Sequence, residues 1–177
     1  KKEKIIQRKR KNKQDKKRGR GMFDEIKNFT KDFLQETKEE DIYLVSHFDT
    51  DGITSAAIFI KTMERLMKQF SVKILKLLTK EEIKKFQENK IIVVLDFGSN
   101  HLNELSKLKN KIFIVDHHEI KNQIPAANIK IINPHLIAGC ENLCTAEIVY
   151  LISKEISEEN KDLAHLAVIG WIGDVMN

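Results

Sequence analysis

Four apolar segments of this sequence end in acidic or imidazole side chains, and this arrangement constrains the fold more than any other feature. The segments cover residues 42–46, 91–95, 112–115 and 161–172. The run Ile91–Leu95 is rich in β-branched residues and has no polar alternation, which is typical of a strand buried on both faces of a parallel sheet. Such sheets bind ligands outside the carboxyl ends of their strands. The sequence therefore predicts a metal site at one edge of a parallel sheet.

The polar clusters are His47-Phe48-Asp49-Thr50-Asp51-Gly52, Asp96, Asp116-His117-His118 and Gly173-Asp174. If residues 47–51 are extended, alternate side chains share a face, so His47, Asp49 and Asp51 point the same way. A carboxylate at the end of a central strand can bridge two cations. Mixed imidazole and carboxylate ligation suits Mn²⁺, with Mg²⁺ as a substitute. Two such ions about 3.5–4 Å apart can clamp a phosphoryl group for in-line attack.

Each of these residues also has an ordinary structural explanation, since Asp often caps a helix and His is often a hydrogen-bonded core residue. The hypothesis therefore depends on all four clusters meeting in one place. Four carboxylates close together in a cleft repel one another without cations. The metal-free site is thus expected either to be disordered or to raise the pKa values of its carboxyl groups.

The alternation of strand and helix patterns predicts an α/β fold. Strands are expected at residues 42–46, 72–78, 91–95, 112–115 and 129–132. Helices are expected at residues 23–37, 52–69, 80–88, 101–108, 144–156 and 161–172. Connections this short imply a parallel, mostly five-stranded sheet with helices on both faces. The length of 177 residues suits one domain with a core of its own.

The charge distribution separates a basic tail, residues 1–21, from a domain over residues 22–177. The tail holds twelve Lys and Arg against two acidic residues, a local charge of +10, whereas the whole chain carries only +5. Such a segment is expected to stay poorly ordered without a partner. It could bind a polyanion by releasing counterions at phosphates, or it could only keep the protein soluble.

The remaining composition argues for a cytoplasmic protein with no membrane contact. No apolar run approaches the roughly 18 residues that a membrane-spanning helix needs. The two cysteines, Cys140 and Cys144, do not suggest a disulfide framework, and a reduced compartment suits them better. They are expected to be small, partly buried thiols, with a zinc site as the weaker alternative.

In order and spacing, the four clusters resemble the four motifs of the DHH phosphoesterase superfamily, over residues 42–174. Within that superfamily, residues 45–57 and the run Ile132-Asn133-Pro134-His135 are similar to archaeal RecJ-like single-strand-specific exonucleases. The resemblance implies that two divalent metal ions, usually Mn²⁺, support hydrolysis of phosphodiester bonds in single-stranded DNA or RNA. It also implies a link to DNA replication or repair, with replication-fork proteins as partners.

The resemblance implies a role for each residue of the clusters. Six residues would ligate metal: His47, Asp49, Asp51, Asp96, His117 and Asp174. His47 and Asp49 would hold the first ion, Asp96 would bridge both ions, and the other three would hold the second.

Three catalytic residues are expected: Asp96, His118 and Asp116. His118 would lie beside the scissile phosphate, and Asp116 would orient a neighbouring imidazole. Asn133 and His135 are candidates for phosphate contact together with His118, although a simple turn before Pro134 explains the first two equally well.

The sequence also departs from the family pattern. The second, substrate-binding domain of the family is expected to be absent from these 177 residues, and residues 139–146 lack the glycine-rich run of many RecJ proteins. One alternative function is a phosphoesterase that cleaves small substrates such as oligoribonucleotides, cyclic dinucleotides or pyrophosphate. Another is a replisome scaffold of RecJ descent that has lost its metal ligands, but every ligand position is filled here.

Overall fold

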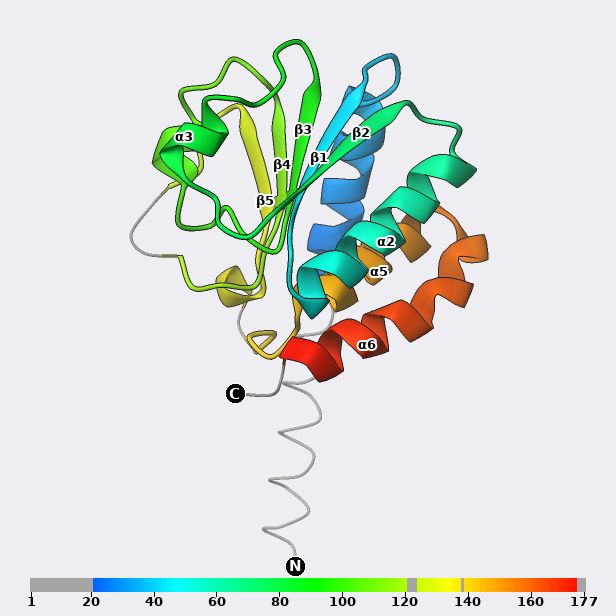
Figure 1. The fold of residues 1–177 in the computed structure, drawn as a ribbon. Coiled ribbons are helices and arrows are strands. Elements are labelled where there is room, and N and C mark those ends of the chain that lie inside the picture. The colour runs from blue at the N-terminus through cyan, green and yellow to red at the C-terminus, as the bar shows by residue number, and fades with distance from the viewer. Residues whose placement is uncertain (1–20, 121–123, 138, 175–177) are drawn as a thin grey trace, which may run out of the picture.

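Five parallel strands form a single sheet in the order β2-β1-β3-β4-β5 (Figure 1). The computed structural model describes residues 21–120, 124–137 and 139–174. The strands are β1 (Ile42–His47), β2 (Phe70–Leu75), β3 (Ile91–Leu95), β4 (Ile112–Val115) and β5 (Ile129–Ile132). The predicted five-stranded α/β fold is therefore confirmed. Strands β3, β4 and β5 have the expected bounds, whereas β2 begins two residues earlier and ends three residues earlier than expected.

Two apolar cores, one on each face of the sheet, explain why the strands lack polar alternation. Along β3, Ile91, Val93 and Leu95 belong to one core, while Ile92 and Val94 belong to the other. All five side chains are at most 5% exposed. Because both faces are buried, a continuous apolar run is the pattern that such a strand requires.

The two faces are covered by helices of very different length. The helices are residues 21–36, α2 (Thr50–Arg65), α3 (Lys80–Ile83), α4 (Leu102–Leu105), α5 (Thr145–Ile156) and α6 (Ala164–Asp174), together with the 3₁₀ segments η1 (Pro134–Leu136) and η2 (Glu158–Leu163). The helix at 21–36, α2 and α5 contribute to the first core, and α3 and α4 to the second. In Figure 1, α2, α5 and α6 accordingly lie on the opposite side of the sheet from α3.

Several predicted helices are shorter than the apolar pattern suggested. The expected helix at residues 80–88 is regular only over α3, and the one at 101–108 only over α4. After Ile83 the chain continues through i→i+3 turns, such as the hydrogen bond from the Phe86 N–H to the Ile83 carbonyl. These turns still bury Ile83 and Phe86, so the apolar spacing is met without a long helix. The expected helix at 161–172 is divided between η2 and α6.

The sheet brings three of the four polar clusters to one end of the molecule. Strand β3 pairs with β1 on one side and β4 on the other, so the residues that follow these strands are neighbours. Asp96 adopts a left-handed conformation with φ of 65°, which is uncommon for a residue other than glycine. Strained backbone of this kind is often found at functional sites.

Two further expectations concern the tail and the membrane. Residues 1–20 of the predicted basic tail lie outside the described residues. Within the described ranges, no helix is both long enough and apolar enough to cross a lipid bilayer.

Candidate metal centre

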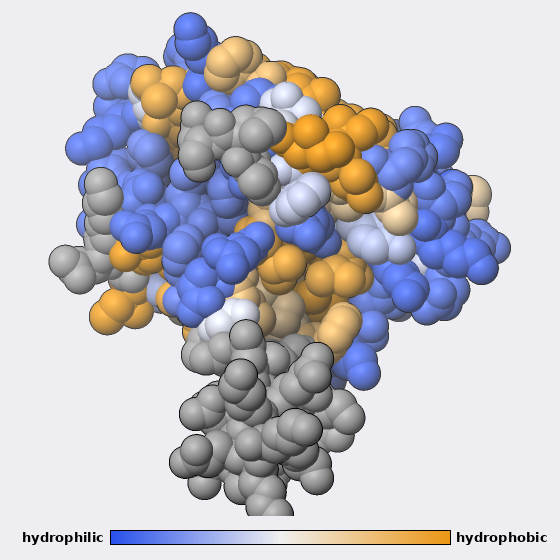
Figure 2. Space-filling view, turned by 90° about the horizontal axis from the view of Figure 1, so that it is seen from below, coloured by the Kyte–Doolittle hydropathy of each residue, from blue (hydrophilic) through white to orange (hydrophobic). Residues whose placement is uncertain are grey.

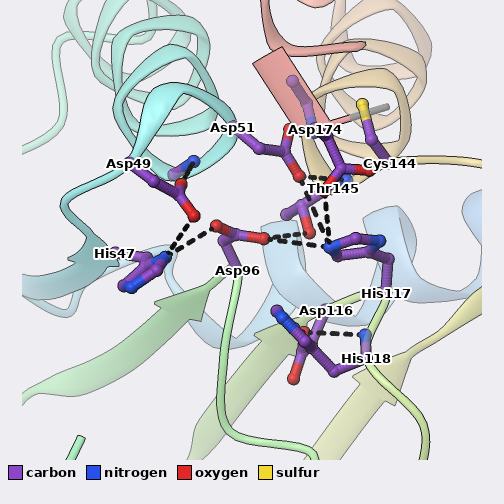
Figure 3. A network of polar contacts seen from close by, with 12 residues as sticks. His47, Asp49, Asp51, Asp96, Asp116, His117, His118, Cys144, Thr145 and Asp174 are labelled. Atoms are coloured by element: carbon purple, nitrogen blue, oxygen red, sulfur yellow. Dashed lines mark hydrogen bonds and ion pairs between the residues drawn. The ribbon is translucent and has the colours of Figure 1, made fainter. Parts of the chain in front are cut away.

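Asp96 lies at the middle of the polar clusters, with a histidine on each side of its carboxylate (Figure 3). Its Oδ2 atom is 3.3 Å from Nδ1 of His47, and its Oδ1 atom is 3.5 Å from Nε2 of His117. The Asp96 side chain is 1% exposed. Its two oxygens therefore face two different sets of ligand atoms, which is the geometry that a bridging carboxylate requires.

His47 is positioned by contacts at both of its ring nitrogens. Its Nε2 lies 3.2 Å from the carbonyl oxygen of Lys76, and its Nδ1 lies 2.7 Å from Oδ2 of Asp49 and 3.3 Å from Oδ2 of Asp96. His47, Asp49 and Asp96 therefore bring one nitrogen and two carboxylate oxygens close enough together to hold a cation between them.

The first turn of α2 positions Asp49 and Asp51, and it corrects one expectation from the sequence. Residues 47–51 are not extended, because β1 ends at His47 and Asp49 is the N-cap of α2, accepting a hydrogen bond from the Gly52 N–H. The chain passes so close to itself here that a Cβ atom at Gly52 would lie 2.5 Å from the His47 carbonyl oxygen. Only glycine fits at this position.

Asp51 is directed away from His47, towards the start of α5. Its carboxylate accepts hydrogen bonds of 2.8 Å from the backbone N–H groups of Thr145 and Ala146. The positive end of the α5 dipole therefore stabilises the buried Asp51 carboxylate. The Thr145 hydroxyl donates to Oδ1 of Asp96 at 3.0 Å. Thr145 is a site residue that the sequence did not single out, because a threonine at a helix start carries no distinctive signal.

The ligand atoms fall into two main groups. His47, Asp49 and Asp96 form one group, and Asp51, His117 and Asp174 form another, with the ligand atoms of each within 4.8 Å of one another. Nε2 of His117 lies 3.4 Å from Oδ1 of Asp174 and 3.9 Å from Oδ2 of Asp51. A third combination joins Asp96 to both His117 and His118. These donors suit a hard or borderline cation such as Mn²⁺ or Mg²⁺.

The pKa values of the carboxyl groups show how the metal-free site carries its charge. Burial, followed by the negative charges of Asp51 and Asp49, raises the pKa of Asp96 to about 10. Burial also raises the pKa of Asp174, against the opposing effect of His117. Asp49 differs from the expectation, because the Gly52 N–H and the neighbouring side chains outweigh its burial and lower its pKa. The charge repulsion is therefore concentrated on Asp96 and Asp174.

Asp116 orients His118 rather than contacting the ligand groups. Its Oδ1 atom lies 2.7 Å from Nδ1 of His118, and its Oδ2 atom accepts a hydrogen bond from the Ser99 N–H at 2.8 Å. The hydrogen bond to Asp116 raises the pKa of His118 despite the partial burial of the ring. The His118 ring is half-exposed, and Asp116 both fixes its direction and favours its protonated form.

Unlike the half-exposed His118, Asn133 is buried and His135 is exposed. Asn133 is 1% exposed, and its amide donates to the Ser99 hydroxyl and the His118 carbonyl and accepts from the His135 N–H. It is the N-cap of η1, which is the turn that the sequence offered as an alternative. Asn133 is therefore too deeply buried for the predicted phosphate contact, whereas the exposed His135 remains accessible to a phosphate.

No disulfide joins Cys140 and Cys144; Cys140 is partly buried and Cys144 is buried. Cys144 precedes α5 and is buried, and its burial, together with the charge of Asp51, raises the pKa of its thiol. Among the described residues, no group of potential metal ligands contains either cysteine.

Comparisons with known proteins identify the family of this chain and structures with a similar fold. The family model of the DHH family, N-terminal domain, matches residues 41–171. An uncharacterized protein of Methanocaldococcus jannaschii is 33% identical over 143 residues, which is 76% of this chain and 33% of that protein. The chain therefore spans about a third of the length of this curated relative.

Two crystal structures have a similar fold. RecJ from Thermus thermophilus in complex with Mn²⁺ superposes with a TM-score of 0.72 and 21% identity, covering 85% of this chain and 24% of that one. Exonuclease RecJ bound to manganese superposes with a TM-score of 0.71 and 20% identity, covering 88% of this chain and 43% of that one. With the family model spanning most of its length, this chain belongs to the DHH family and carries the N-terminal domain of that family.

Proposed function

We propose that this protein is a metal-dependent phosphodiester hydrolase that acts on single-stranded nucleic acid from an end, as an exonuclease. The observation that carries the proposal is the position of Asp96, whose two carboxylate oxygens face His47 on one side and His117 on the other. Two ligand groups on either side of one carboxylate are the arrangement needed for two metal ions acting on one phosphate. RecJ, a structural neighbour with a similar fold, is an exonuclease that binds manganese.

Each residue contributes in a distinct way to this proposed reaction. His47 and Asp49 would hold one Mn²⁺, Asp51, His117 and Asp174 would hold the other, and Asp96 would serve both. Bound ions would supply Lewis acidity and a stronger nucleophile at neutral pH. Bound cations would also offset the burial and the neighbouring negative charges that raise the pKa of Asp96 in the free protein, and that of Asp174 likewise.

His118 donates a hydrogen bond to a phosphate oxygen or protonates the leaving group. Asp116 fixes the direction of the His118 ring and raises its pKa, which favours the protonated ring. A positioned proton donor of this kind typically contributes about 10²–10⁴-fold to the rate. His118 is half-exposed, which lets a substrate reach it.

The basic tail favours a polymeric substrate over a small one. Twelve Lys and Arg residues in residues 1–21 can neutralise several phosphates of a nucleic acid strand, but they have no clear use on pyrophosphate or a dinucleotide. A small-substrate phosphoesterase is the alternative, because it would share the same metal ligands. Partners at the replication fork remain part of the proposal.

The decisive experiment follows degradation of end-labelled single-stranded DNA and RNA in the presence of Mn²⁺ or Mg²⁺. We expect nucleotides to be released progressively from one end, and we expect Asp96→Ala to abolish this release. Asp162→Ala, at an exposed aspartate of η2, is the matched control and should remain active. Rapid hydrolysis of pyrophosphate or a cyclic dinucleotide without degradation of the polymers would support the small-substrate alternative instead.

A further inference from the structure

A pocket opens beside the polar clusters, on the side of His47 and His118. It is lined by His47, Asp96, Asp116 and His118 from the candidate metal centre, and by residues of the loops after β2 and β3. Its volume is about 180 Å³. Ligand sites for drug-sized molecules have about 300–1,000 Å³. This pocket therefore fits a single ring system that is attached to a group bound at the metal centre.

Outside the metal centre, the pocket is lined by apolar residues and by the polar side chains of Lys76, Asn100 and His101. Leu77 and Leu78 come from the loop after β2, and Phe97 from the loop after β3. Leu77 is 67% exposed, although a leucine in a loop gains nothing from solvent contact. A flat apolar ligand in the pocket would cover Leu77 and Phe97 together.

Two aromatic rings contact His47: Phe97, which lines the pocket, and Phe48, which lies outside its lining. The Phe97 ring centroid is 5.8 Å from that of His47, and the Phe48 ring centroid is 5.1 Å from it, both in edge-to-face geometry. Phe48 is 50% exposed and lies under the ammonium group of Lys76, with 5.8 Å between Nζ and the ring centroid. The surroundings thus offer aromatic faces and a positive charge next to the proposed phosphate position.

Hydrophobic and hydrophilic residues lie side by side on this end of the molecule, which Figure 2 views from below. A nucleotide combines the same two properties, because its base is a planar aromatic ring and its phosphate is an anion. Pyrophosphate has no ring and would leave the apolar walls exposed to water. The chemistry of the pocket therefore matches a nucleotide rather than a purely inorganic phosphate.

We infer that this pocket is a base-binding subsite, in which Phe97 and Leu77 of the pocket lining, together with Phe48 beside His47, hold the base of the nucleotide next to the scissile phosphate. Lys76 lies where it can contact the backbone phosphate of that nucleotide. Stacking on aromatic side chains tolerates every base, because each base has a π-face. The subsite should therefore require a base without selecting its identity. This inference rests on the proposed function.

The test compares two substrates that differ only in the terminal base. One is a short single-stranded oligonucleotide, and the other carries an abasic tetrahydrofuran residue at the cleaved end. With Mn²⁺, the intact substrate should be cleaved with a kcat/KM about 5- to 150-fold higher, as expected for one stacked base. Phe48→Leu and Phe97→Leu keep apolar volume but remove the aromatic face, so each should bring this ratio towards one by slowing only the intact substrate.

Two controls separate this inference from the proposed function. Phe23→Leu changes a phenylalanine about as exposed as Phe48, 55% against 50%, which neither lines the pocket nor contacts His47, and it should leave the ratio unchanged. Mn²⁺ affinity measured by calorimetry should be the same in all variants. Equal rates on both substrates with the unmodified protein would overturn the subsite and leave the hydrolase intact. Failure to cleave either substrate would overturn the proposed function itself.

A second measurement does not depend on turnover. A nucleoside monophosphate carrying the fluorescent base 2-aminopurine should be quenched when it binds the Mn²⁺-loaded protein, because stacking on an aromatic ring quenches this base. Quenching should weaken in Phe97→Leu and persist in Phe23→Leu. Binding without quenching in the unmodified protein would show that the base stays in solvent, and would contradict the subsite.

Discussion

Asp96 is a buried carboxyl group whose protonation state decides the stability of the metal-free protein. Its pKa is raised to about 10, whereas an unfolded aspartate has a value of about 3.9. A raised pKa means that the stabilising contribution is complete below about pH 4 and is lost as the pH rises towards 10. With EDTA present, the free energy of unfolding should therefore fall between pH 5 and pH 8.

The variant Asp96→Asn tests this dependence, because asparagine stays neutral at every pH. We expect it to flatten the pH dependence of urea unfolding in EDTA and to make the metal-free protein more stable at pH 8. Asp162→Asn is the control. The hydrogen bond to Arg65 lowers the pKa of Asp162, so the contribution of Asp162 to the free energy of unfolding is lost only as the pH falls below the range from pH 5 to pH 8. An unchanged slope in Asp96→Asn would contradict the prediction.

His118 should matter for turnover rather than for metal affinity. Its ring is fixed by Asp116 and lies outside both main ligand groups. We expect His118→Ala to lower kcat by about 100-fold or more, as for loss of a positioned proton donor, while calorimetry shows Mn²⁺ affinity like that of the unmodified protein. Loss of Mn²⁺ binding would mean that the roles of His117 and His118 have been exchanged, as the grouping of both with Asp96 would allow.

Helix α6 brings Asp174 into the site because it packs very closely against α2 and α5. A Cβ atom at Gly170 would lie 2.4 Å from the Ala146 Cβ and 2.6 Å from the Thr54 Oγ1. Gly170→Ala should therefore push α6 outward, destabilising the fold by about 1–3 kcal/mol as overpacking usually does. Displacement of Asp174 should also weaken Mn²⁺ binding.

The control for this variant is on the same helix. Val168 is 54% exposed, so Val168→Ala should change the melting temperature only slightly and leave Mn²⁺ affinity unchanged. Thermal melting with and without Mn²⁺ measures both effects. If Gly170→Ala melts like the unmodified protein and binds Mn²⁺ equally well, the close approach of α6 does not position Asp174.

Metal binding should stabilise the whole molecule, because its ligands come from segments 47–51, 96, 117 and 174 that are far apart in the sequence. An ion that binds only the folded protein stabilises it by about 2.7 kcal/mol at a hundred times its dissociation constant. We expect the melting temperature to rise with Mn²⁺ concentration, and to rise much less in Asp96→Ala. A melting curve that does not respond to millimolar Mn²⁺ would refute the two-ion centre.

The basic tail should act on binding rather than on chemistry. Deleting residues 1–21 should weaken binding to single-stranded nucleic acid and flatten its salt dependence. The slope of log affinity against log salt concentration should change by roughly 0.7 for each phosphate no longer neutralised. Cleavage of a dinucleotide that occupies only the metal centre should be nearly unchanged. Equal salt slopes with and without the tail would instead assign it to solubility or to binding a protein.

The sequence predicted the sheet well because burial on both faces leaves a strong local signal. The bounds of β3, β4 and β5 follow from short apolar runs rich in β-branched residues, whose side chains enter the cores on the two faces of the sheet. The helices were harder to predict. Apolar spacing near Ile83 and Phe86 is satisfied by turns as well as by a helix, so the pattern could not set the length of α3.

By itself, the sequence determined that polar side chains would meet at the carboxyl ends of parallel strands, because buried apolar runs that alternate with helices form parallel strands whose carboxyl ends lie at one edge of the sheet. Only the tertiary structure decided which atoms each of these side chains faces. The two oxygens of Asp96 face different histidines, Asp51 points at the start of α5, and Asp116 holds His118. These directions depend on helix caps and on the packing of α5 and α6 against α2, which join residues about a hundred positions apart and therefore leave no local pattern.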